Sequence, residues 1–126
     1  MGKLGTTKEG TTSAGIVKVI KEYGFAGKLK YNLKMEDIIR GMKRGKVYIV
    51  NYQLMREKGK SWKNTWEYGH YSVVADIDKE YIYIMDPWDG MIEKMDRDKF
   101  IKRWHDTDKN GKNWGTGIEI KGAKNG

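Results

Sequence analysis

GHYSVV, residues 69–74, and IMDPW, residues 84–88, are the two segments that decide the fold of this chain. Both are rich in apolar, aromatic and β-branched residues, which is typical of β-strands. His70 enters the first strand and Asp86 leaves the second, 16 residues later. Two strands of about five to seven residues joined by a tight turn would bring these two side chains together. A histidine beside a carboxylate is the orienting half of a nucleophilic catalytic triad.

Composition limits the chemistry. The 126 residues suit one domain, and the 12% aromatic content argues against disorder. The chain has no cysteine, which excludes disulfides, thiolate metal sites and a cysteine nucleophile within it. With only two histidines, His70 and His105, and no HExxH spacing, we expect neither a metal site nor a cofactor.

The net charge of +8 is concentrated in the first half of the chain. Residues 1–66 carry +10 and residues 67–126 carry −2. Such a basic half is typical of a solvated lysine-rich surface, and could also meet nucleic acid or an acidic partner. Neither a secretory signal nor an apolar run of about 20 residues is present, so we expect a cytoplasmic chain without a membrane span.

The first half predicts two helices and two strands. An apolar face and a following Gly24 favour a helix over residues 14–23, after an entry arm at residues 1–12. Alternating residues between 25 and 33 favour a short strand. Met35, Ile38, Ile39 and Met42 form a helical stripe that Gly45 ends, and residues 47–52 form a central strand. A polar loop over residues 53–68 follows.

The second half predicts a meander. Strands are expected at residues 71–76, 81–85 and 91–95, then a helix capped by Asp96 that carries Trp104 in the core and ends near His105. His105 would then be a cation at a helix C-terminus. Residues 107–113 read as a loop, residues 114–121 as an edge strand and residues 122–126 as a frayed tail. The whole is one α+β domain, with N-terminal helices packed on an antiparallel sheet.

Four segments carry a resemblance to a known family: LGTTKEGTT (4–12), VYIVNYQ (47–53), GHYSVVADID with YIMDPWDG (69–78 and 83–90), and FIKRWHD (100–106). Together they resemble the papain-like cysteine peptidases of family thirty-nine, which process bacteriocins, and their peptidase-like relatives. The resemblance extends from residue 4 to about residue 121 and implies a papain-like fold.

The resemblance implies a general base at His70 and an orienting carboxylate at Asp86. In this family, the nucleophilic cysteine and the oxyanion-hole glutamine lie on a helix that precedes the segment matched by residues 4–12. That first helix is therefore expected to be missing from this chain. A weaker register would place Thr11 or Thr12 at the nucleophile position, where threonine is a poor replacement for a thiolate.

Three further residues are candidates for substrate binding: Gly69, Trp66 and Trp88. Gly69 either lets the backbone approach closely at the site or is an ordinary bulge glycine. Trp66, with Trp62 and Tyr68, either lines a peptide groove or packs onto the core. Trp88 either walls the site or caps the sheet, and Asp86, before a proline, also suits a purely local turn role.

Three functions follow. The first is a truncated or inactive cysteine peptidase domain that keeps the His70–Asp86 pair without a nucleophile. The second is a non-catalytic module that binds a peptide or a protein leader segment. The third, nucleic-acid binding, rests on charge alone. Loss of the first helix would expose an apolar face, which predicts a homodimer through that face.

Overall fold

The computed structural model describes residues 6–7, 10–11, 26–86 and 89–121. The predicted helix at residues 14–23, the tail from residue 122 and most of the entry arm lie outside these ranges. The elements in chain order are β1 (Thr6–Thr7), β2 (Gly10–Thr11), β3 (Ala26–Lys30), α2 (Met35–Lys43), β4 (Val47–Gln53), the 3₁₀ helix η2 (Trp62–Asn64), β5 (Gly69–Ile77), β6 (Tyr81–Met85), β7 (Ile92–Asp96), α3 (Arg97–Arg103), β8 (His105–Asp108), β9 (Gly111–Trp114) and β10 (Gly117–Lys121).

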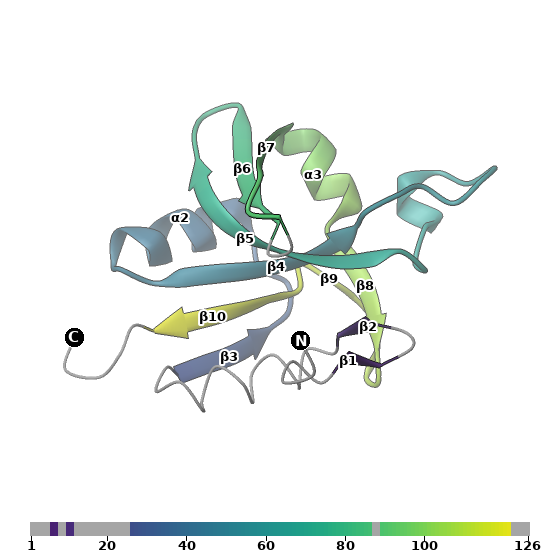
Figure 1. Cartoon of the computed structure of the whole chain (residues 1–126), viewed down its shortest axis with the longest axis horizontal. Coiled ribbons are helices and arrows are strands. Elements are labelled where there is room, and N and C mark those ends of the chain that lie inside the picture. Colours follow the sequence, from purple (N-terminus) through teal and green to yellow (C-terminus); the bar gives the residue numbers. More distant parts are fainter. Residues whose placement is uncertain (1–5, 8–9, 12–25, 87–88, 122–126) are drawn as a thin grey trace.

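A six-stranded antiparallel sheet forms the centre of the fold (Figure 1). Its order is β3-β10-β4-β5-β6-β7, so the meander predicted for β4 to β7 is confirmed. The prediction that residues 114–121 form an edge strand is wrong, because β10 lies between β3 and β4. Ile118 faces Leu29 on one side and Ile49 on the other, and it is fully buried.

Helix α2 forms where the apolar stripe predicts it. The carboxylate of Asp37 accepts from the backbone N–H of Lys34 and so satisfies a free donor at the helix start. Gly45, with φ of 83°, takes the left-handed conformation that ends the helix. A Cβ at Gly41 would lie 1.9 Å from the Tyr48 hydroxyl, so the absence of a side chain lets α2 pack closely on β4.

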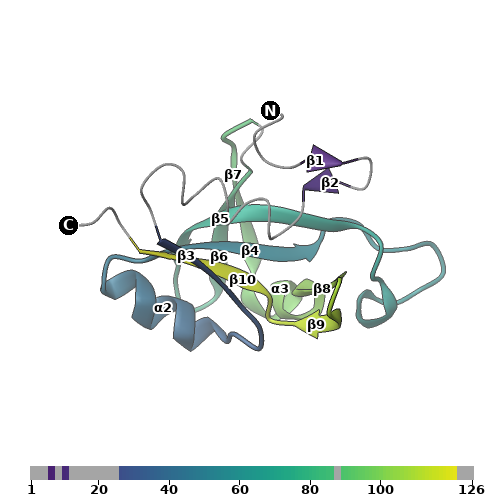
Figure 2. The same cartoon turned by 90° about the horizontal axis from the view of Figure 1, so that it is seen from below.

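The core lies between the sheet and the helices. Figure 2 shows α2, α3 and the β8–β9 hairpin on one face of the sheet, with the short β1–β2 pair on the other side. Trp104 is 3% exposed, which confirms its predicted place in the core. Among the described residues, the buried apolar side chains that pack into one cluster are those of Met35, Ile38, Tyr48, Val50, Tyr52, Val74, Ile82, Ile84, Met95, Phe100 and Trp104.

The segment after α3 differs from the sequence prediction. Asp96 caps α3 as predicted, accepting from the N–H groups of Asp98 and Lys99, but the helix ends at Arg103. His105 begins a strand, and the expected loop at residues 107–113 is the β8–β9 hairpin. His105 is therefore not a helix C-terminal cation but a fully buried strand residue.

Candidate functional site

His70 and Asp86 lie together, as the strand–turn–strand pattern predicts. The distance between His70 Nε2 and Asp86 Oδ2 is 3.0 Å. The antiparallel pairing of β5 with β6, with Val73 opposite Met85, brings the start of one strand to the end of the other. When Nε2 carries the proton and donates to the carboxylate, the lone pair of the neutral ring is on Nδ1. The imidazole is then oriented to accept a proton at Nδ1.

Neighbouring groups hold this pair in place. Tyr52, which pairs with His70 across β4 and β5, presents its ring edge-on at a centroid distance of 5.8 Å. The Tyr52 hydroxyl is 3.0 Å from Ser72 Oγ, and burial raises the pKa of this tyrosine. The backbone N–H of Asp86 donates to the Met91 carbonyl, and the backbone carbonyl of Asp86 accepts from the Gly90 N–H. These two backbone hydrogen bonds leave the Asp86 carboxylate to His70.

Gly69 lies against a partly buried carboxylate, that of Asp106, which the sequence did not predict as a neighbour of the site. A Cβ at Gly69 would lie 2.0 Å from Asp106 Oδ2, so the backbone before His70 approaches the Asp106 side chain closely. Of the two interpretations of Gly69, close approach fits. Asp106 accepts from Asn51 Nδ2 at 2.9 Å and from Gln53 Nε2 at 3.1 Å. Burial raises the pKa of Asp106, and these hydrogen bonds offset part of the rise.

Gln53 links this cluster to the loop over residues 54–68. Its Nε2 also donates to the His105 carbonyl, and its Oε1 accepts from the Tyr68 N–H. Within the loop, the Glu57 carboxylate accepts from the N–H groups of Trp66 and Glu67. The loop is thus tied down at both its base and its middle.

Trp66 packs onto the folded body of the protein. Its ring lies 4.4 Å from the His105 ring and 5.7 Å from that of Trp114, and Lys112 Nζ lies 5.0 Å above it. Trp62, also on this loop, stacks under the Arg103 guanidinium at 4.4 Å. These contacts fit the core-packing interpretation of the tryptophans better than the groove-lining one. Trp88 lies outside the described residues.

Burial favours the neutral form of the His105 ring. Burial lowers the pKa of His105, while its contact with the Thr65 carbonyl, 2.7 Å from Nε2, works in the opposite direction. The rings of Trp66 and Trp114 lie on it at centroid distances of 4.4 and 4.1 Å. The two histidines therefore differ: His70 is partly exposed beside a carboxylate, and His105 is a core residue.

Two features are absent from the described part of the chain. No group of three or more His, Cys, Asp or Glu side chains there could hold a metal ion. Among those same residues, no helix has the length and apolar character needed to cross a bilayer.

Comparison with known proteins places this geometry in a family. The chain is 29% identical over 109 residues to "Transport/processing ATP-binding protein ComA" of two Streptococcus pneumoniae strains, R6 and TIGR4. That match covers 79% of this chain but only 12% of those relatives. The chain thus spans about an eighth of their length.

Two solved structures share the fold. One is the peptidase domain of Streptococcus ComA, a bi-functional ABC transporter involved in a quorum-sensing pathway. Its TM-score is 0.59 and its sequence identity 21%, and the match covers 94% of this chain and 72% of the solved one. The other is the peptidase domain of Streptococcus mutans ComA, with a TM-score of 0.54, 21% identity, and coverage of 92% and 79%. A match to the Peptidase C39 family extends over residues 1–107. The chain therefore belongs to the Peptidase C39 family.

Proposed function

We propose that this chain is a C39-type domain that binds peptides and provides the general-base half of a cysteine peptidase site. The 3.0 Å contact between His70 Nε2 and Asp86 Oδ2 carries the proposal. In this reading, Nδ1 of His70 takes the proton from a thiol, and the thiolate attacks the peptide carbonyl. The protonated imidazole then returns the proton to the departing amine, and Asp86 stabilises the imidazolium and its orientation.

The thiol is the part that these residues do not contain, since the sequence has no cysteine. We therefore propose that the 126-residue polypeptide does not hydrolyse peptides by itself. A thiolate, which attacks the carbonyl, and an oxyanion donor would have to come from outside it, and each accounts for orders of magnitude in rate. Threonine at position 11 or 12 would not replace a thiolate, because its hydroxyl is far less acidic than a thiol.

The surface next to the pair suits a peptide with apolar side chains. Met91 and Ile92 are 68% and 59% exposed. The Met91 carbonyl accepts from the Asp86 N–H, and Ile92 pairs with Met85. Exposed apolar side chains beside a functional pair are typical of a binding surface. The same surface supports the second candidate, a module that binds a peptide or a leader segment without cleaving it. The homodimer remains a separate proposal, for the face that the first helix of the family would cover.

A binding experiment and a hydrolysis experiment separate the candidates. ¹⁵N-labelled chain is titrated with apolar peptides, and we expect chemical-shift changes at Tyr52, His70 and Met91. Met91→Ser should weaken this binding, whereas Ile101→Ser, which alters an exposed apolar residue on α3, should leave it unchanged. A spectrum that does not respond to any peptide would refute both candidates.

The hydrolysis experiment uses the native gene product from its source cell. Its intact mass is compared with 14.6 kDa, and peptide hydrolysis is measured with and without a thiol-alkylating reagent. Thiol-dependent hydrolysis that His70→Gln abolishes supports the peptidase. Peptide binding without any hydrolysis supports the non-catalytic module. Sedimentation velocity at high concentration tests the homodimer.

A further inference from the structure

An open polar pocket lies at the end of the sheet occupied by α2, away from His70. Its volume is about 340 Å³, and its walls come from α2, the end of β3, the start of β4 and β10. Tyr48 forms part of its lining, and Tyr52, the neighbour of His70, lies four residues further along the same strand. At about 3.3 Å per residue the two sites are roughly 13 Å apart along β4.

Four cationic side chains line this pocket against two carboxylates. The cations are Lys30, Arg40, Arg44 and Lys46, and the acids are Asp37 and Glu119. The lining thus carries an excess of two positive charges. It belongs to the basic half of the chain, whose partner the sequence alone does not identify.

The two carboxylates are already engaged by the protein. Glu119 Oε1 accepts from Lys30 at 3.1 Å and from Lys46 at 3.4 Å, and its Oε2 accepts from the Tyr48 hydroxyl at 2.6 Å. Asp37 receives the Lys34 N–H on one oxygen and Arg40 on the other. The pKa of Glu119 lies below its ordinary value: burial raises it, but the hydrogen bond from Tyr48 and the two lysines lower it by more.

The arginines keep donors for a ligand. Arg40 uses one terminal nitrogen for Asp37, and the remaining N–H groups of its guanidinium are not needed for that contact. Arg44 has no ion pair with any residue that the structure describes, and it lies four positions after Arg40, so both side chains project from one face of α2 and its cap. Two guanidinium groups in this spacing match the oxygens of a phosphate, which arginine binds with paired hydrogen bonds.

We propose that this pocket binds a small molecule that carries a phosphate group, with Arg40 and Arg44 as its direct contacts. Its volume is near the lower end of the range for small-molecule sites, which suits a phosphate group carried on a small organic portion. Lys30, Lys46 and Tyr48 contact Glu119 and so contribute to the structure of the pocket, not to direct binding of the ligand. The site does not depend on the His70–Asp86 pair, so either proposal can fail without the other.

The test is a ¹⁵N NMR titration of the whole chain with inorganic phosphate, pyrophosphate and a phosphate monoester, at constant ionic strength set with NaCl. We expect saturable shifts centred on Arg40, Arg44 and Lys46, with the monoester or pyrophosphate binding more tightly than phosphate. Arg40→Gln/Arg44→Gln should weaken binding by at least about tenfold, because the loss of a single charge-assisted hydrogen bond already accounts for a factor of that size and the variant removes both arginines.

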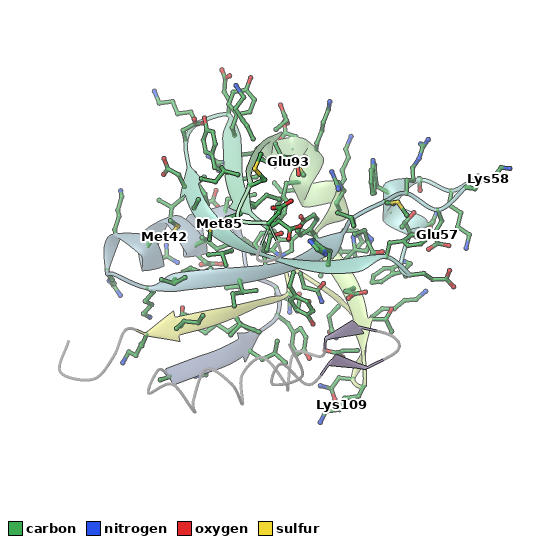
Figure 3. All side chains as sticks on the ribbon, viewed as in Figure 1. Met42, Glu57, Lys58, Met85, Glu93 and Lys109 are labelled. Carbon is green, nitrogen blue, oxygen red and sulfur yellow. The ribbon has the colours of Figure 1, made fainter. Side chains whose placement is uncertain are left out.

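A matched control removes the same charge elsewhere. Lys58 projects from the end of the molecule opposite α2, where Met42 is labelled (Figure 3). Lys63, on η2, belongs to the same loop and is also exposed. Lys58→Gln/Lys63→Gln should retain the binding within about twofold, the change expected from long-range charge alone. Non-saturable shifts spread over many lysines would overturn the proposal, as would equal losses in the two double variants. Retention of a dispersed spectrum shows that each variant is folded.

Discussion

Gly69→Ala tests the close approach of β5 to the Asp106 side chain. The added Cβ would lie 2.0, 2.5 and 2.7 Å from Asp106 Oδ2, Cγ and Oδ1. Ordinary contact begins at 3.4 Å, so the carboxylate must move by roughly 1.4 Å. That movement breaks the hydrogen bond that Asn51 Nδ2 donates to the carboxylate. Gln53 Nε2 retains its hydrogen bond to the His105 carbonyl. Overpacking and the loss of one partly buried, charge-assisted hydrogen bond together predict a loss of about 2–4 kcal/mol in the free energy of unfolding.

Urea unfolding followed by tryptophan fluorescence measures this loss. The control is Gly45→Ala, where a Cβ meets nothing within 4 Å. Its φ of 83° makes alanine cost about 1 kcal/mol from backbone strain alone. Asp106→Ala removes the atoms that a residue-69 side chain would strike. The free-energy changes of Gly69→Ala and Asp106→Ala should therefore sum to more than that of the double variant, by about 1–2 kcal/mol. Additive changes, or equal costs at positions 69 and 45, would refute the steric argument.

Three other variants or titrations probe stability. Glu119→Gln should destabilise the chain at pH 7, because it removes the charge that the two lysines and Tyr48 stabilise. The folded pKa of Glu119 lies below its ordinary 4.5, so the stability that the ionised carboxylate contributes is full above pH 4.5 and is lost as the pH falls further. Urea unfolding curves of the variant and the parent should therefore converge in acid. Asp96→Ala removes the N-cap of α3 and should cost about 1 kcal/mol in the same assay, whereas an unchanged midpoint would mean that the cap is dispensable. Burial lowers the pKa of His105, so its ring should stay neutral in the folded state as the pH falls below 6.5. Its NMR signal should therefore titrate at a lower pH than that of a free histidine, and the free energy of unfolding should fall below pH 6.5, where the unfolded chain takes up the proton. An unshifted titration would contradict its burial.

Local patterns in the sequence predicted much of the fold. The stripe from Met35 to Met42 marks α2, and the apolar residues of 47–52 and 81–85 mark β4 and β6 within one residue. The spacing from His70 to Asp86 predicted their contact, because a hairpin is a local structure whose ends are fixed by its own length.

Features that depend on distant residues were not predicted. The alternation in residues 117–121 indicates a strand but does not name its partners, Lys30 and Val50 among them, which lie far away in the chain. His105 looked like a helix C-terminal cation because the two aromatic rings that enclose it come from the loop and from β9. Asp106 went unnoticed as a site neighbour, since only the folded chain places it against Gly69.

The central position of β10 has a consequence for how the protein is made. β4 can pair with β5 soon after both emerge from the ribosome, but its other edge waits for β10. Gly117 lies 64 positions after Gln53, and translation of that stretch takes roughly 3–13 s at about 5–20 residues per second. During that interval the VYIVNYQ strand has an open edge with high β-propensity, a template for pairing between nascent chains. Crowded translation of this chain should therefore favour aggregation unless that edge is shielded until the last strand arrives.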